Sequence, residues 1–121
     1  MKITCGATPH HIMWDSSKME GPNGLLYKIN PPLRDIESVL GLRQRLIEGK
    51  IDWIETDHAP HTIDQKLRYP HASGYPSLTL YHQFITEFLP GLGLSQEQIT
   101  ALTSKNIIRV FYEKFRQAGI I

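Results

Sequence analysis

The segment 57–61 (Asp-His-Ala-Pro-His) carries the densest group of chemically reactive side chains in the sequence, and it directly follows the apolar run 51–56. An aspartate at the carboxyl end of a buried strand lies where α/β barrels and open α/β sheets place their active sites. The Asp57 carboxylate is a hard oxygen ligand for a divalent metal, or a general base toward a metal-bound water. The alternative is that Asp57 caps a turn, and the sequence spacing alone leaves both interpretations open.

Two pairs of histidines accompany this aspartate. His58 and His61 have the i, i+3 spacing of a helical metal-binding pair, but Pro60 disfavours a helix, so we expect them to point in different directions from a loop. His10 and His11 follow a strand-like run. Because adjacent side chains on extended backbone point to opposite faces, we expect at most one of them to face a site. The interpretation we favour has one buried and hydrogen-bonded and the other exposed.

Asn30 stands before two consecutive prolines, which hold its amide on a rigid turn. Such an amide is suited to binding a carboxylate or another amide, although an asparagine here is also a common turn former. Cys5 has no companion base in the sequence, and we interpret it as a small apolar strand residue.

Length and composition limit the classes of function. The chain has 121 residues, 40% hydrophobic and 21% charged, which is typical of one folded segment spanning 1–121. Thirteen Lys and Arg against twelve Asp and Glu leave a charge of +1, so nothing indicates a nucleic-acid or membrane surface. The single cysteine and the absence of a secretory signal pattern favour a reducing cytoplasm.

The elements expected to position these residues form an α/β layer. We predict three parallel strands over residues 2–8, 25–30 and 51–56. The apolar stripe over 35–49 predicts a helix that crosses between the second and third strands. Residues 62–76 show no apolar periodicity, and we expect a long functional loop there.

The remainder is predicted to be helical. Ser77 is expected to cap a helix over 78–89. Ser95 and Gln98 form a capping-box pattern that predicts a helix start at residue 96, continuing to about residue 103. A last helix is expected over 105–118, because Gly119 can end it.

Four segments together resemble the carboxyl-terminal part of dihydroorotase, in its order and at its approximate separations. The Asp-His-Ala-Pro-His block is shared more loosely with hydantoinases and allantoinases, whereas Asn-Pro-Pro-Leu-Arg favours dihydroorotase. The segments are 8–11 (Thr-Pro-His-His), 28–34 (Lys-Ile-Asn-Pro-Pro-Leu-Arg), 56–61 (Thr-Asp-His-Ala-Pro-His) and 73–76 (Ser-Gly-Tyr-Pro).

The resemblance implies a metal-dependent amidohydrolase that reversibly cyclises N-carbamoyl-L-aspartate to dihydroorotate in pyrimidine biosynthesis, with two zinc ions in the complete enzyme. It implies that Asp57 is both a metal ligand and the catalytic group that moves a proton to and from the bridging hydroxide. By the same resemblance Asn30 and His61 bind the substrate, and backbone groups around Gly74 and Pro76 line its pocket.

The resemblance also implies an incomplete site. A complete (β/α)₈ barrel needs roughly 250 residues, so we expect a partial TIM-type barrel with about the last three strands and the carboxyl-terminal helices. A catalytic zinc site needs about three protein ligands, and only Asp57 matches one, so we expect the isolated chain to be inactive. The expected partner is the missing amino-terminal part of the barrel or a second copy of the chain.

The sequence leaves four hypotheses about function open. The first is a fragment of a dihydroorotase. The second is a non-catalytic dihydroorotase-like scaffold or assembly partner, which the departures from the family pattern at Gly6, Ser77 and 107–108 favour. An allantoinase- or hydantoinase-type fragment and an unrelated α/β binding module are the remaining alternatives.

Overall fold

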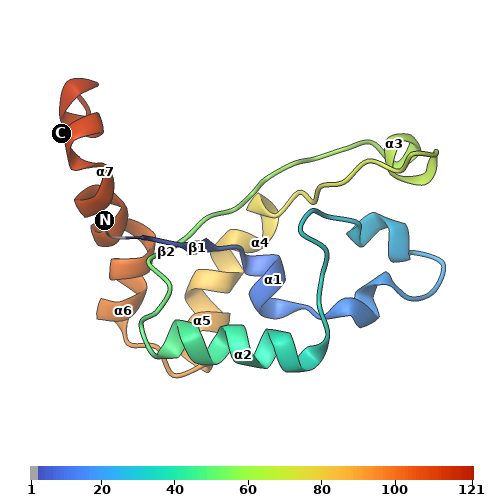
Figure 1. The fold of residues 1–121 in the computed structure, drawn as a ribbon, viewed down its shortest axis with the longest axis horizontal. Coiled ribbons are helices and arrows are strands. Elements are labelled where there is room, and N and C mark those ends of the chain that lie inside the picture. Colours follow the sequence, from blue (N-terminus) through green and yellow to red (C-terminus); the bar gives the residue numbers. More distant parts are fainter. Residues whose placement is uncertain (1–2) are drawn as a thin grey trace.

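The computed structural model describes residues 3–121, so Lys2 of the first predicted strand lies outside the described residues. The described part of the chain is mostly helical, with two short strands (Figure 1). Its elements in chain order are β1 (Gly6–Ala7), α1 (Pro9–Met13), η1 (Ser16–Met19), η2 (Gly24–Tyr27), α2 (Ile36–Ile47), β2 (Trp53–Ile54), α3 (Ile63–Leu67), α4 (Leu78–Gln83), η3 (Phe84–Phe88), α5 (Leu89–Gly91), α6 (Gln96–Thr100), η4 (Ala101–Lys105) and α7 (Asn106–Gln117).

Strands β1 and β2 pair in parallel, with Gly6 opposite Trp53 and Ala7 opposite Ile54. The predicted parallel pairing is therefore confirmed, but the ladder is shorter than the runs 2–8 and 51–56. The pairing is extended by backbone hydrogen bonds beyond each end of the ladder. One runs from the Asp52 amide to the Cys5 carbonyl (2.8 Å), and the other from the Glu55 amide to the Ala7 carbonyl (3.0 Å).

The strand predicted over 25–30 is wrong, because the sheet of the described residues has two strands. Residues 24–27 instead form the 3₁₀ turn η2, closed by hydrogen bonds from the Leu26 amide to the Asn23 carbonyl and from the Lys28 amide to the Leu25 carbonyl. The Lys28 carbonyl then accepts from the Gly74 amide at 3.0 Å. A distant loop, rather than a neighbouring strand, pairs with this segment.

Helix α2 confirms the helix predicted over 35–49 and closes one side of the core, but in chain order it lies between β1 and β2, because the strand expected over 25–30 is absent from the described residues. Asp35 caps it by accepting from the Ser38 amide at 2.8 Å, and Gly49 follows its end with a positive φ of 71°. Arg43 joins α2 to α1 by donating to the carbonyls of Ile12 (2.8 Å) and Met13 (3.0 Å), at the carboxyl end of α1. Because those carbonyls have no partner within their own helix, Arg43 acts as a cap supplied by another element.

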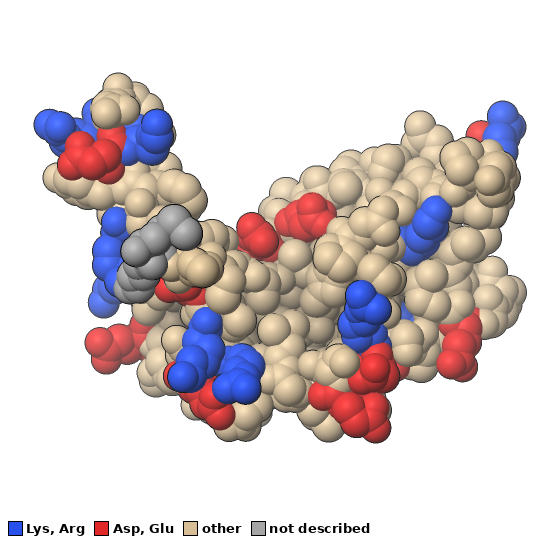
Figure 2. Space-filling model, viewed as in Figure 1, with Lys and Arg blue, Asp and Glu red and all other residues tan. Residues whose placement is uncertain are grey.

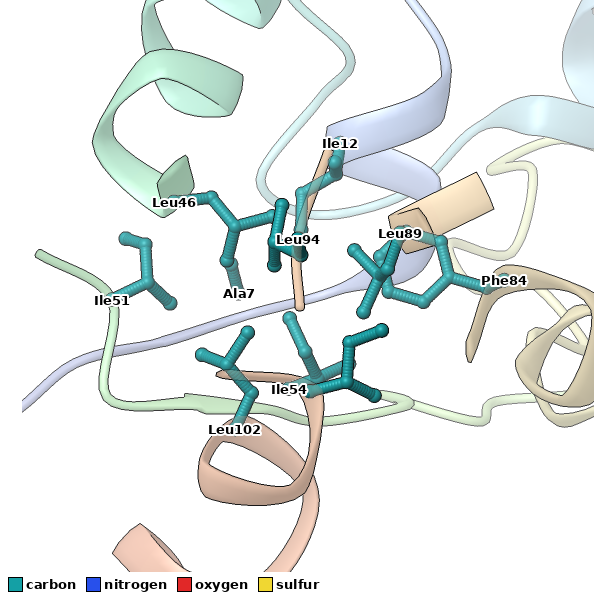
Figure 3. Close-up of a cluster of buried hydrophobic side chains, with 10 residues drawn as sticks. Ala7, Ile12, Leu46, Ile51, Ile54, Phe84, Leu89, Leu94 and Leu102 are labelled. Atoms are coloured by element: carbon teal, nitrogen blue, oxygen red, sulfur yellow. The ribbon is translucent and has the colours of Figure 1, made fainter. Parts of the chain in front are cut away.

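The core is a single cluster between the strand pair and the surrounding helices (Figure 3). The two strands contribute Ala7 and Ile54, while α1 and α2 contribute Ile12 and Leu46, which are 0% and 2% exposed. Ile51, just before β2, adds to the cluster, and the carboxyl-terminal helices and their connection supply the rest, namely Phe84, Leu89, Leu94, Ile99 and Leu102. The two strand ends are thereby fixed in position relative to α1.

The helical prediction for the last third holds, with one error at a helix start and one at a predicted helix break. The reciprocal capping box of Ser95 and Gln98 is present at α6. The Ser77 hydroxyl does not cap α4. It points back and donates to the Thr56 carbonyl. Residues 96–110 continue as one helical run through the π segment η4, so the predicted break near residue 104 is absent there. A kink lies further on, at Phe111, whose φ of −104° and ψ of 15° are not helical.

The segment 62–76 is more ordered than predicted. It contains helix α3, which begins with a second reciprocal capping box formed by Thr62 and Gln65. In Figure 1, α3 lies at the end of an extended arm, and α7 projects from the opposite side of the molecule. Among the described residues, no helix is long and apolar enough to span a membrane.

Candidate active site

An open cleft of about 530 Å³ lies at the carboxyl ends of the two strands. It brings together Asn30 and Asp57, two residues that are 27 positions apart in the sequence. Both side chains are exposed to solvent. The full lining is Gly6, Ala7, Thr8, His11, Asn30, Pro31, Pro32, Arg34, Leu42, Glu55 and Asp57.

At Asp57 the backbone leaves the extended conformation of the preceding strand. Its φ is +46°, in the left-handed region that Asp and Asn adopt more readily than most residues. The preceding residue, Thr56, is anchored through its carbonyl by the Ser77 hydroxyl, and Ser77 is 0% exposed. A strained residue held by a buried contact is typical of functional positions, because the surroundings must maintain its conformation.

Asn30 is held near the strand ends through its neighbour Pro31. The Nε2 atom of His11 lies 2.8 Å from the Pro31 carbonyl, which can only accept, so Nε2 carries a proton. In the neutral ring Nδ1 then accepts from the Thr8 hydroxyl at 2.6 Å, while that hydroxyl accepts from the His11 amide at 3.3 Å. Thr8 and His11 thus connect the end of β1 to the Asn30 segment.

The expectation for the adjacent histidines is corrected in two respects. They lie in helix α1 and not on extended backbone. The hydrogen-bonded residue is the half-buried His11, whereas His10 is 1% exposed and both of its ring nitrogens lack a partner among the described residues. Burial, and secondarily the neighbouring His11, lower the pKa of His10 from 6.5 to about 4, although Asp57 acts in the opposite direction.

His58 contributes to the fold at the start of α4. Its Nδ1 atom accepts from the Leu78 amide at 3.1 Å, so His58 supplies the capping hydrogen bond expected from the Ser77 hydroxyl, while Ser77 remains the N-cap residue. A nitrogen that accepts a backbone hydrogen bond is not free to bind a metal in the same arrangement.

His61 does not line the cleft. It borders a second cavity of about 400 Å³ beside α3, together with Asp64, Gln65 and Arg68. Its Nε2 atom lies 3.1 Å from the Ser73 carbonyl. The structure therefore connects His61 with the loop that carries Gly74, and separates it from Asn30 and Asp57.

Gly74 is buried and packs against the segment 59–61. A Cβ atom at this position would lie 2.5 Å from the Ala59 carbonyl oxygen and 2.9 Å from a ring carbon of His61, and φ is +150°. Only glycine fits this close approach. Pro76 follows on the exposed surface, and neither residue lines the cleft.

The sequence reasoning missed Thr8, Arg34 and Glu55 as lining residues of the cleft. Thr8 could have been found, because a threonine before Pro9 is a typical helix start and places His11 at the third helical position. Cys5, expected to be an apolar strand residue, is exposed, and its thiol lies 3.4 Å from the Lys50 carbonyl.

The acidic groups of the cleft are Glu55 and Asp57. Figure 2 shows acidic side chains exposed in the concave region between α7 and the arm that carries α3. Within residues 3–121 there is no group of three or more His, Cys, Asp or Glu side chains that could hold a metal ion. In this cleft the described residues therefore offer a metal at most the carboxylates of Glu55 and Asp57, which is not a complete ligand set.

In sequence the chain is similar to curated dihydroorotases. It is 37% identical over 114 residues to the dihydroorotase of Fusobacterium nucleatum subsp. nucleatum, a match that covers 92% of this chain and 27% of that protein. It is 36% identical over 128 residues to the dihydroorotase of Lactobacillus gasseri, covering 100% of this chain and 29% of the relative. The chain thus spans about a quarter of the length of these relatives, and the similarity falls in their carboxyl-terminal part.

In structure the chain is similar to part of two hydantoinases. It superposes on the D-hydantoinase (dihydropyrimidinase) from Thermus sp. with a TM-score of 0.80 and 24% identity, covering 89% of this chain and 25% of that one. The L-hydantoinase (dihydropyrimidinase) from Arthrobacter aurescens gives a TM-score of 0.74 at 21% identity, covering 90% of this chain and 25% of the other. These matches show that the fold of this chain corresponds to about a quarter of a hydantoinase chain. No protein-family model matches the sequence.

Proposed function

The chain is homologous to the carboxyl-terminal part of dihydroorotases, and from this premise we propose that it forms one side of the active site of a dihydroorotase-type cyclic amide hydrolase. The observation that carries the proposal is the cleft shared by Asn30 and Asp57 at the carboxyl ends of β1 and β2. Active sites of α/β barrels lie at this end of the strands, and the two strands are proposed to belong to such a barrel.

In this proposal Asp57 is the catalytic group. Its carboxylate exchanges a proton with the water that attacks the amide carbon of the ring, which is general acid–base catalysis, and it would also be one ligand of a metal ion. The left-handed backbone at Asp57 and the anchored Thr56 carbonyl support this role, because they fix the direction of the carboxylate.

Asn30 is the proposed substrate-binding residue within the cleft. Its amide can donate to a substrate carboxylate and accept from a ring N–H. His61, Gly74 and Pro76 are proposed to contact the substrate from the adjoining loop. This requires a ligand that extends beyond the cleft toward that loop, since the three residues lie outside the cleft lining.

A bound zinc ion would supply hydroxide by lowering the pKa of its water, and would polarise the ring carbonyl. The donor set of the described residues does not complete a site for it, since a catalytic zinc needs about three protein ligands. We therefore propose that residues outside this chain provide the other ligands, and that the purified chain with added zinc does not hydrolyse dihydroorotate.

The test is a replacement experiment. This chain is substituted for the matching segment of the Fusobacterium nucleatum dihydroorotase, and hydrolysis of dihydroorotate is followed by its absorbance. We expect the chimera to hydrolyse dihydroorotate and the isolated chain with zinc to show no turnover. A chimera that unfolds cooperatively like its parent but is inactive would favour the scaffold alternative. Hydrolysis of hydantoin without hydrolysis of dihydroorotate would contradict the substrate assignment.

A further inference from the structure

Lys66 in α3 is a buried cation whose partners in the described structure are backbone carbonyls. It is 4% exposed, and its ammonium donates to the carbonyls of Lys28 and Gly74, each at 2.7 Å. Burying an ammonium is costly, because the group loses its hydration. In agreement, burial and then the neighbouring Lys28 lower the pKa of Lys66. The two carbonyl contacts must offset this cost, so the segments that carry them indicate what Lys66 does.

The two carbonyls belong to two different parts of the proposed site. Lys28 lies two residues before Asn30, and Gly74 lies in the loop that packs against His61. The Lys28 carbonyl also accepts from the Gly74 amide at 3.0 Å. One ammonium therefore closes a short ring of hydrogen bonds that fixes both segments at a single point.

The segment before Asn30 and the Gly74 loop thus meet at a junction, and the side chain of Lys28 adds further hydrogen bonds to it. Its ammonium donates to the carbonyls of Pro70 (2.9 Å) and His71 (2.5 Å), which lie between α3 and Gly74. Helix α3 also packs against η2, the turn that leads into Lys28. The junction thus joins the arm seen in Figure 1 to the segment before Asn30.

We propose that Lys66 is a positioning residue for the substrate site, whose ammonium clamps the Gly74 loop to the Asn30 segment so that both can contact one ligand. The proposal rests on the proposed function, because it assigns the two segments to one substrate. Lys66 itself does not touch the substrate. It acts through the carbonyls of Lys28 and Gly74.

The first test measures amide hydrogen exchange by NMR in the full 121-residue chain. Lys66→Met keeps the length and apolar stem of the side chain and removes the donors, and Lys114→Met on the exposed face of α7 is the matched control. Loss of two charged hydrogen bonds is expected to speed exchange of the Gly74 amide by about tenfold or more. The Leu46 amide in α2 should change less than about twofold, as should both amides in the control.

The second test is a titration of the same samples with dihydroorotate, followed by the amide shifts of Asn30 and Gly74. We expect both to shift in the unmodified chain, and the affinity to fall by about tenfold or more in Lys66→Met. Unchanged Gly74 exchange would overturn the clamp, and equal acceleration of Gly74 and Leu46 would show that Lys66 holds the whole fold instead. Faster Gly74 exchange with unchanged affinity would overturn the positioning role. An unmodified chain with no shifts but the expected exchange would contradict substrate binding by this side of the site and leave the clamp supported.

Discussion

His10 is a buried histidine whose pKa is strongly lowered. His10 is buried and neither of its ring nitrogens has a partner within residues 3–121, so the ring is stable there only in its neutral form. Because its pKa falls from 6.5 to about 4, the unfolded chain binds a proton more readily than the folded chain between those two pH values. The contribution of the neutral His10 ring to the free energy of unfolding is therefore present in full above pH 6.5, and it is lost as the pH falls toward 4.

We therefore predict that His10→Leu flattens the dependence of stability on acidity. The shift corresponds to about 3 kcal/mol between neutral pH and pH 4, and the variant should lose this part of the dependence. The measurement is the free energy of unfolding in urea at several pH values. His82→Leu, at an exposed position, is the control and should keep the parental dependence. An unchanged pH dependence in His10→Leu would contradict this account.

At the residue scale, local patterns indicated where two of the polar side chains lie. Asp57 follows a strand end and Asn30 precedes a proline pair, the resemblance to dihydroorotase assigned both to one site, and the structure places both on the lining of one cleft. The placement of His61 beside α3 could not be predicted, because it depends on the path of a loop fixed by the carbonyls of Ser73 and Gly74. The pairing of Ser77 with Thr56 is equally non-local.

At the scale of elements, the start of α4 is attached to the strand end by two side-chain hydrogen bonds. The Ser77 hydroxyl donates to the Thr56 carbonyl, and the Leu78 amide donates to His58. These bonds connect the α4 terminus with the segment that presents Asp57.

Ser77→Ala should lower the free energy of unfolding by about 1–2 kcal/mol, because it leaves a carbonyl without its donor in a buried setting. Chemical denaturation of the chain measures the change. Ser17→Ala, at an exposed position, serves as the matched control and should change stability by less than about 0.5 kcal/mol. Equal effects of the two substitutions would show that the Ser77 contact does not stabilise α4.

Helices were predictable and strands were less so, for a physical reason. Helix α2 and the capping box of α6 depend on residues close in the chain, so their patterns suffice. The run 25–30 lacks a strand partner in the described structure, and that information is tertiary. Gly6 illustrates the same point. A Cβ there would lie 2.4 Å from the Trp53 indole nitrogen, so its departure from the family pattern is tied to its partner on β2.

For the molecule as a whole, the short sheet and the exposed apolar side chains indicate missing contacts. Several large apolar residues are far more exposed than is usual for a core-forming type, among them Ile63 (68%), Tyr69 (85%) and Ile120 (66%). Burial contributes roughly 25 cal/mol per Å² of apolar surface, so a partner that covers them gains substantially.

We predict that the purified chain forms a dimer or a larger assembly. Light scattering across a concentration series measures its molar mass, and the mass per particle should rise with concentration. Addition of the remaining part of the Fusobacterium nucleatum dihydroorotase should replace this self-association by a mixed complex. Self-association and the mixed complex would each cover the same open edges of the sheet. A monomer at micromolar concentration would contradict the prediction.

We propose that Asp57 performs the chemistry and that Asn30 binds the substrate within one cleft. In the replacement chimera, Asp57→Asn preserves a side chain that tolerates the left-handed backbone while removing the charge, so folding should be retained. The direct measurement is the steady-state kinetics of dihydroorotate hydrolysis. We predict that Asp57→Asn lowers kcat by about 10²–10⁴-fold, and that Asn30→Ala mainly raises KM, by about tenfold. Turnover that survives both zinc chelation and Asp57→Asn would contradict the account.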